Sequence, residues 1–131
     1  LSVEKRLNSW LWTFDNLNVH EKIFVAENED GNIIGFSSGG KSRNKDFKHD
    51  GELYAIYLLK SYQRLGIGKL LFNSVVGSLR INGYSSMMLW VLKDNPSVAF
   101  YKSLGGKILG QKTILRGEDN FVELAIGWDS I

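Results

Sequence analysis

Gln63-Arg64-Leu65-Gly66-Ile67-Gly68-Lys69 joins two apolar segments of different character. The segment before it, residues 53–59, is predicted as a strand, and residues 66–82 have the apolar spacing of a helix. A strand that turns through glycines into a helix leaves backbone N–H groups unpaired at the positive end of the helix dipole, where phosphate groups bind. The sequence therefore predicts a phosphate or pyrophosphate site at this turn.

Two nucleotide-binding motifs use similar glycines, and both fail here on spacing. A dinucleotide fingerprint needs a third glycine three residues after the second, where this chain has Leu71. A Walker A loop needs a four-residue gap between its glycines and a Ser or Thr after its lysine. Gly66 and Gly68 are only two positions apart, and Lys69 is followed by a leucine. Neither nucleotide-binding motif is therefore present, and a helix that merely begins with glycines is the alternative to a phosphate site.

The local charge supports an anionic ligand. The whole chain is nearly balanced, with 16 Lys and Arg against 14 Asp and Glu. Between Leu53 and Lys93, however, there is no acidic residue, so this segment is a local positive field suited to a polyanion. It contains the cations Lys60, Arg64, Lys69, Arg80 and Lys93.

A second motif lies at residues 95–106. Asn95 is a strong N-cap, Pro96 suits the first helical position, and Gly105 suits a helix end. The pattern predicts a short helix with Asn95 at its mouth and Tyr101 about two turns further on.

The two motifs, Gln-x-x-Gly-x-Gly and Asn-Pro-x-x-Ala-x-Tyr-x-x-x-Gly, resemble those of the GNAT superfamily of acyl-CoA-dependent N-acyltransferases. The match runs from about Phe24 to the C-terminus. The resemblance implies an α/β (α+β) domain whose mixed, mostly antiparallel sheet splays at the cofactor site and is flanked by helices. Residues 1–131 would form one such domain. The family usually opens with a strand and a helix before the element matching residues 2–14, so we expect an N-terminally truncated domain.

The resemblance also implies a cofactor, acetyl-CoA, and no metal. Backbone groups of Leu58 and Lys60 would pair with the pantetheine arm, and N–H groups between Arg64 and Lys69 would hold the pyrophosphate. The Leu58 N–H would also donate to the thioester carbonyl. The residues implied for cofactor binding are Leu58, Leu59, Lys60, Arg64, Leu65, Gly66, Ile67, Gly68, Lys69, Asn95 and Tyr101.

Tyr101 is implied as the general acid for the coenzyme A thiolate, since a phenol near pKa 10 and a thiol near 8.5 are well matched. A core aromatic on an amphipathic helix is the alternative. Glu52 is the first candidate for the general base, against an ordinary solvated carboxylate at a strand end, and Glu123 is the second. His20 and His49 lie in predicted loops and are weak candidates.

Trp10, Trp12 and Phe14 are candidates for the wall of an acceptor pocket, because their region borders the substrate in similar folds. Most of this cluster is expected to be core.

Composition limits the other classes. A 44% apolar fraction predicts an ordered globular domain, and the absence of cysteine excludes disulfides and a cysteine nucleophile. No apolar run reaches the length of a membrane span, so a cytoplasmic location is expected. A net charge of +2 argues against a nucleic-acid binder.

The remaining elements follow from periodicity and turn residues. We expect helices at 2–14 and 96–104, an exposed loop at 39–51, and strands at 23–26, 32–37, 86–92, 108–115 and 121–128.

The leading hypothesis is an N-acetyltransferase in which a primary amine, from a small molecule or a peptide, attacks acetyl-CoA directly in a ternary complex. A coenzyme A-binding module without catalysis and a nucleotide-binding interaction domain are the alternatives. An absent first strand would leave an open sheet edge, for which a homodimer is one solution.

Overall fold

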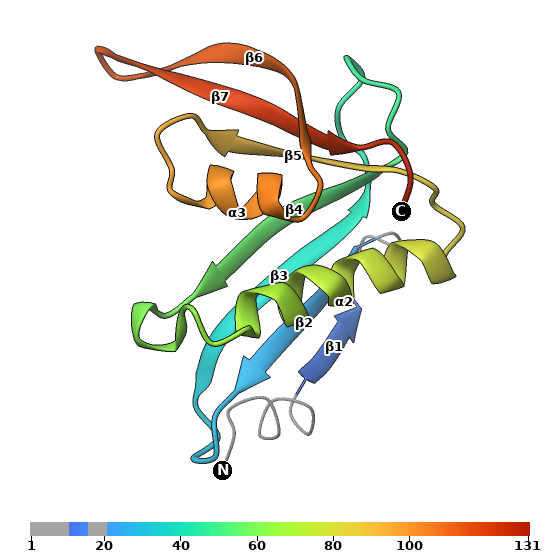
Figure 1. Cartoon of the computed structure of the whole chain (residues 1–131), viewed down its shortest axis with the longest axis vertical. Coiled ribbons are helices and arrows are strands. Elements are labelled where there is room, and N and C mark those ends of the chain that lie inside the picture. The colour runs from blue at the N-terminus through green and yellow to red at the C-terminus, as the bar shows by residue number, and fades with distance from the viewer. Residues whose placement is uncertain (1–10, 16–20) are drawn as a thin grey trace.

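The computed structural model describes residues 11–15 and 21–131, and for 11–15 it describes the backbone alone. These residues form one sheet with helices against it (Figure 1). The strands are β1 (Leu11–Asp15), β2 (Lys22–Glu27), β3 (Ile33–Lys41), β4 (Gly51–Leu58), β5 (Met87–Leu92), β6 (Lys107–Arg116) and β7 (Asp119–Trp128). The helices are α2 (Ile67–Ile81), α3 (Ser97–Ser103) and the short 3₁₀ turn η1 (Lys60–Tyr62).

The sheet has seven strands in the order β1-β2-β3-β4-β5-β7-β6. Every neighbouring pair is antiparallel except β4 and β5, which run parallel and are joined through α2. The predicted mixed, mostly antiparallel sheet flanked by helices is therefore confirmed.

Helix α2 covers β2, β3 and β4 (Figure 1). Its buried side chains recur at helical spacing: Ile67, Leu71, Phe72, Val75 and Leu79. Burying each large apolar side chain contributes about 1.5–3 kcal/mol, so this face fixes the position of the helix.

The loop predicted at 39–51 is shorter in the structure, because strands occupy both of its ends. β3 continues to Lys41, and β4 begins at Gly51. The glycines that suggested a loop instead permit close packing, because a Cβ on Gly39 would overlap Cγ1 of Val75. His49 is also buried rather than exposed.

The predicted helix at 2–14 is wrong for its last four residues. Residues 11–14 lie in β1, which pairs antiparallel with β2 from Leu11↔Ala26 to Asp15↔Lys22. A short apolar run fits helix and strand patterns almost equally, so periodicity could not separate them. The rest of the predicted helix lies outside the described residues.

Both helices end at a glycine, and for the second helix the sequence predicted it. Gly83 and Gly105 have φ of 89° and 95°, in the left-handed region that a helix end uses. The N–H of Tyr84 donates to the Leu79 carbonyl, and the N–H of Gly106 donates to the Tyr101 carbonyl. These bonds close the last turn of each helix.

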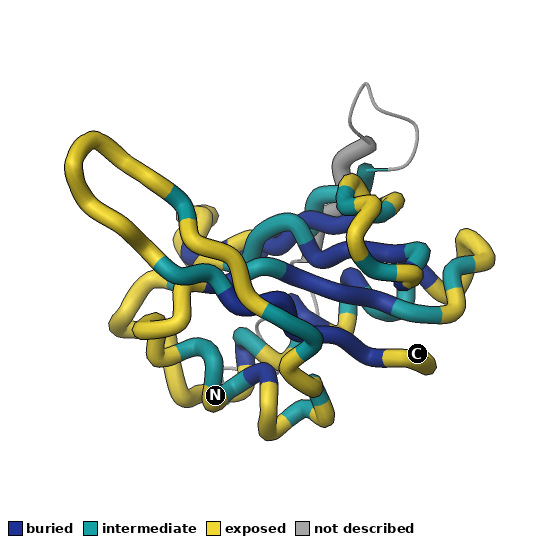
Figure 2. The backbone as a smooth tube through the Cα atoms, turned by 90° about the horizontal axis from the view of Figure 1, so that it is seen from above, coloured by how far each residue is buried: buried dark blue, intermediate teal, exposed yellow. Residues whose placement is uncertain are grey.

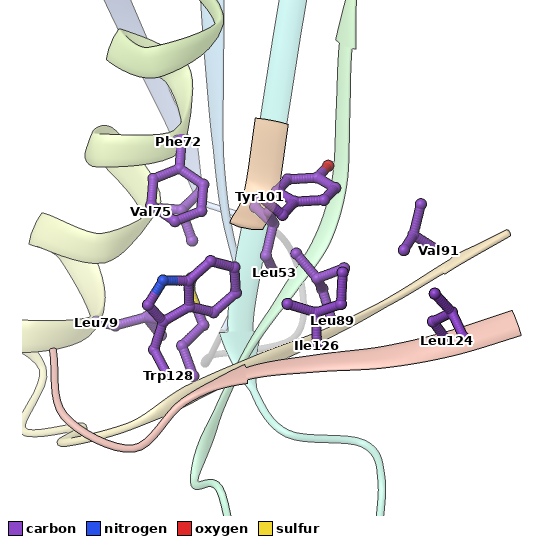
Figure 3. Packing of buried hydrophobic residues seen from close by; sticks show 11 residues of the cluster. Leu53, Phe72, Val75, Leu79, Leu89, Val91, Tyr101, Leu124, Ile126 and Trp128 are labelled. Atoms are coloured by element: carbon purple, nitrogen blue, oxygen red, sulfur yellow. The ribbon is translucent and has the colours of Figure 1, made fainter. Parts of the chain in front are cut away.

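The main core lies where α2 and α3 meet β4, β5 and β7 (Figure 3). Trp128 of β7 packs there against Phe72, with ring centroids 5.2 Å apart. Its indole Nε1–H donates to the Leu104 carbonyl at the end of α3. This bond ties α3 to the sheet.

The hairpin of β6 and β7 extends away from this core, and its tip is exposed (Figure 2).

Candidate functional site

The sheet opens between β4 and β5. The two strands pair only at Gly51↔Met87 and Glu52↔Met88, and beyond these residues they diverge. On its other side, β4 stays paired with β3 as far as Leu58. The predicted splay is thus present, and it leaves one edge of the second half of β4 without a described strand.

Leu58 directs its backbone into this opening. The N–H of the next residue, Leu59, donates to the Ile34 carbonyl of β3 at 2.9 Å. Because backbone groups alternate sides along an antiparallel strand, the N–H and C=O of Leu58 point away from β3. The Leu58 carbonyl accepts a hydrogen bond from Gln63 Nε2 at 3.0 Å, so its N–H is the group available to a ligand. The motif glutamine therefore holds the turn against β4, a role that the sequence did not reveal.

The turn after η1 presents the start of α2 to the same opening. Arg64 and Gly66 have φ of 64° and 86°, which turns the chain sharply into the helix. No side chain caps the helix, and its first internal bond runs from the Leu70 N–H to the Gly66 carbonyl. The N–H groups of residues 67–69 therefore have no partner within α2 and lie at its positive end.

A cavity of about 650 Å³, here called the outer cavity, lies at this helix end. Its volume is in the range of sites that bind small molecules. Lys60, Arg64 and Lys69 line it, and no acidic residue in the described part of the chain does. The arrangement is suited to a polyanion.

Most of the predicted cofactor residues come together on this lining. Leu58, Lys60, Arg64, Gly66, Gly68 and Lys69 are among the lining residues. Five are not. Asn95 and Tyr101 line a second cavity described below, and the other three are Leu59, whose N–H donates to β3, Ile67, which is buried in the core, and Leu65, which is exposed.

Gly68 has room for a side chain. A Cβ there would meet only Phe100, at an ordinary van der Waals distance of 3.7 Å. Glycine in a helix costs about 1 kcal/mol relative to alanine, and the packing around Gly68 does not require it. The open space beside the three N–H groups instead fits close approach of a ligand.

A second cavity of about 230 Å³, the inner cavity, lies between the diverging strands. Ile56 and Ser97 line both cavities, so the two adjoin. The inner cavity also brings together Tyr101, Asn95 and Glu123 from three different elements.

Tyr101 is both core residue and cavity residue. Its side chain is 5% exposed, and its ring packs against Phe72 and Trp128 (Figure 3). It also packs against the neighbouring Phe100. Burial raises the pKa of Tyr101 to about 12. Tyr101 is therefore a weaker proton donor to a thiolate than an exposed tyrosine would be. The phenol is better suited to donating a hydrogen bond than to giving up its proton.

Asn95 caps α3 as predicted, although the helix itself begins one residue later, at Ser97. The Asn95 side-chain oxygen accepts the Ser97 N–H at 2.8 Å. This bond accounts for the asparagine, and it holds the residue on the wall of the inner cavity.

The two candidate bases are placed differently. Glu52 is 3% exposed and lines neither cavity. Its two oxygens accept hydrogen bonds from the backbone N–H and the guanidinium of Arg43, at 2.8 and 3.1 Å. Glu123 does line the inner cavity, and its Oε1 lies 3.8 Å from Lys112 Nζ. Position therefore favours Glu123 over Glu52, and the solvated strand-end reading of Glu52 is wrong.

His49 is a structural residue of the segment between β3 and β4. Its Nε2 lies 2.9 Å from Asp129 Oδ1, and it lines neither cavity. Lys107 also bonds Asp129, and these two hydrogen bonds lower the pKa of that carboxyl, with Lys107 the larger cause. The side chains of Trp10, Trp12, Phe14 and His20 lie outside the described residues.

Two aromatic residues of the inner cavity were missed. Tyr54 and Trp90 line it from β4 and β5. Each carries a cation on its ring, with Arg43 at 3.8 Å from the Tyr54 centroid and Lys112 at 4.1 Å from that of Trp90. Strand alternation could have found Trp90, because Leu89 and Val91 are core residues and Trp90 must face the opposite side.

Residues 11–15 and 21–131 contain no cluster of His, Asp or Glu arranged to hold a metal ion. The helices described there are all too short or too polar to cross a membrane.

The family model for the acetyltransferase (GNAT) family matches residues 2–106. YuaI of Bacillus subtilis (strain 168), named as an uncharacterized N-acetyltransferase, is 37% identical over 109 residues. The alignment covers 83% of this chain and 63% of YuaI, so the chain spans less than two thirds of its relative.

Solved structures share the fold. Nourseothricin acetyltransferase has a TM-score of 0.71 at 20% identity, over 82% of this chain and 64% of its own. The structure of yncA from Salmonella typhimurium with its cofactor acetyl-CoA has a TM-score of 0.67 at 21% identity, over 82% and 64%. The family's cofactor is acetyl-CoA, as the two sequence motifs predicted. The chain belongs to the acetyltransferase (GNAT) family.

Proposed function

We propose that the protein is an N-acetyltransferase, in which a primary amine attacks acetyl-CoA directly within a ternary complex. The supporting observation is the opening between β4 and β5, which leads from the inner cavity to the uncapped end of α2. The acceptor is a small-molecule or peptide amine.

In this proposal the outer cavity binds the phosphates of acetyl-CoA. The N–H groups of residues 67–69 and the cations Lys60, Arg64 and Lys69 supply donors and positive charge. The pantetheine arm lies along the open edge of β4 and takes the Leu58 N–H, since the Leu58 carbonyl is held by Gln63.

The thioester then lies in the inner cavity. A backbone N–H that points at the thioester oxygen stabilises the negative charge that develops there as the amine attacks. Glu123 receives the amine proton, directly or through a water, and Tyr101 donates a hydrogen bond to the departing sulfur. Tyr101 thus acts with its proton retained or shared, because its raised pKa opposes full transfer.

A coenzyme A-binding module without catalysis is the second candidate, and one observation favours it. Both carboxylates considered as bases already face a cation, Glu52 with Arg43 and Glu123 with Lys112. To act as a base, Glu123 must give up its ion pair with Lys112. That pair is already loose, because the distance from Lys112 Nζ to Glu123 Oε1 is longer than a hydrogen bond.

Calorimetric titration with acetyl-CoA, with ATP and NAD as comparison ligands, tests the binding half of the proposal. Thiol release in the presence of a panel of primary amines tests the chemical half. Selective acetyl-CoA binding with amine-dependent thiol release supports the transferase. Binding without release with any amine supports the module, and no binding to the folded protein refutes both.

A further inference from the structure

Lys112 of β6 holds its amine against two residues of the inner cavity. Its Nζ lies 4.1 Å from the centroid of the Trp90 ring and 3.8 Å from Glu123 Oε1. The strand register places Lys112 directly opposite Glu123. Both partners line the inner cavity. The chain therefore carries a primary amine of its own beside the carboxylate that we propose as base.

The contacts of Lys112 hold it near the cavity without fixing it there. The Nζ–Oε1 distance exceeds that of a hydrogen bond, and the side chain is 47% exposed. An aromatic face contributes only about 0.5–1 kcal/mol to holding an exposed ammonium. The amine is thus free to leave the ring and move along Glu123 towards the opening.

Lys107, on the same strand, offers a contrast. Its Nζ makes a 2.9 Å hydrogen bond to Asp129, which lines neither cavity. Its side chain is 66% exposed, so it is more accessible to solvent than Lys112. Solvent accessibility alone would therefore favour acetylation of Lys107 over Lys112.

We propose that Lys112 is an internal acceptor, so that the protein acetylates its own Lys112 Nζ when acetyl-CoA is bound. This inference rests on the proposed function and adds a modification site to it. The acceptor class that it indicates is an alkylammonium with an unbranched stem, recognised by an aromatic face and a carboxylate.

The reaction balances with acetyl-CoA as the co-reactant. A bond forms between Nζ and the acetyl carbonyl carbon, and the carbon–sulfur bond breaks. Of the three ammonium protons, one stays on the amide nitrogen, one passes through Glu123 to solvent, and one ends on the coenzyme A thiol. The product side chain is uncharged, so Glu123 loses its cationic partner.

The test uses the whole chain, incubated with acetyl-CoA and no added amine, followed by peptide mapping with mass spectrometry. We expect acetylation at Lys112 about 100-fold faster than at Lys107, the size of an ordinary general-base contribution. The Lys112 rate constant should not change with protein concentration, because the acceptor is in the same molecule.

Glu123→Gln provides the matched variant, because it keeps the size of the side chain and removes the proton acceptor. It should lower the Lys112 rate to that of Lys107 while acetyl-CoA affinity, measured by calorimetry, stays the same. Lys112→Arg keeps the positive charge and should abolish the modification without creating a new site.

The outcomes separate this inference from the proposed function. If acetyl-CoA binds and Lys112 reacts no faster than Lys107, self-acetylation is refuted and the proposed function stands. A Lys112 rate constant that rises in proportion to protein concentration would refute an internal acceptor. If the folded protein binds no acetyl-CoA, the proposed function fails and self-acetylation fails with it.

Discussion

Replacing Gly68 with alanine should raise the stability of the protein and lower its affinity for acetyl-CoA. Gly68 lies in the first turn of α2, without a positive φ, and a Cβ there would meet only Phe100 at 3.7 Å. Removing a helical glycine therefore stabilises the fold by about 0.5–1 kcal/mol. For a domain of this size, that raises the midpoint of thermal unfolding by about 2–4 °C.

The loss of affinity follows from the unpaired N–H groups around the same position. A methyl group keeps a phosphate from approaching them closely, and one charge-assisted hydrogen bond contributes about 1.5–3 kcal/mol. The dissociation constant should rise by about 10- to 100-fold, as measured by calorimetry. Gly68→Asp should abolish binding, while its carboxylate remains favourable for the fold at a helix N-terminus.

Gly77 is the matched control. It lies in the same helix, and a Cβ there would meet no atom within 4 Å. Gly77→Ala should stabilise the protein by a similar amount, about 1 kcal/mol, and leave acetyl-CoA binding unchanged. Equal affinity of the Gly68→Ala and Gly77→Ala variants would refute the assignment of this turn as the phosphate site.

Three further predictions concern the core and its tyrosines. Tyr101→Phe should cut amine-dependent thiol release and leave acetyl-CoA affinity and the unfolding midpoint nearly unchanged, whereas equal losses in all three would make Tyr101 purely structural. Trp128→Phe should lower the free energy of unfolding by about 1–3 kcal/mol in urea titrations, because the Leu104 carbonyl loses its indole donor, and an unchanged value would contradict that role. Burial raises the pKa of both Tyr54 and Tyr101 to about 12, so the unfolded chain releases these phenolic protons first, near pH 10. Stability should therefore be unaffected below about pH 10 and fall as pH rises from 10 to 12, and a flat urea midpoint over that window would count against these shifts.

The sequence predicted local structure best where a single residue determines the conformation of the backbone next to it. Gly105 ends α3 through its positive φ, and the Asn95 side chain caps the same helix. Gly66, just before α2, is also in the left-handed region, which glycine adopts readily. These requirements depend on the backbone of a few adjacent residues, so they can be predicted from the local sequence.

Prediction from the sequence is weakest where residues that are distant in the chain determine the local structure. Gly39 suggested a loop, but it lies in β3 because Val75 of α2 packs against it. Glu52 was preferred to Glu123 as base because it begins the central strand. Which of the two faces the cavity depends on where β4 and β5 part, and no local pattern encodes that point.

The divergence of β4 and β5 divides the sheet into two ladders, which are linked by two residue pairs. One ladder is β1-β2-β3-β4 and the other is β5-β7-β6. The pantetheine arm of acetyl-CoA, lying along the second half of β4, would pair with it in place of a neighbouring strand. The cofactor would then act as a piece of secondary structure, adding a link between the two ladders to the core that they already share. Bound acetyl-CoA should slow amide hydrogen exchange in β5 as well as β4, although it touches mainly β4. A bound metabolite would thus strengthen the cooperativity between the two halves of the domain.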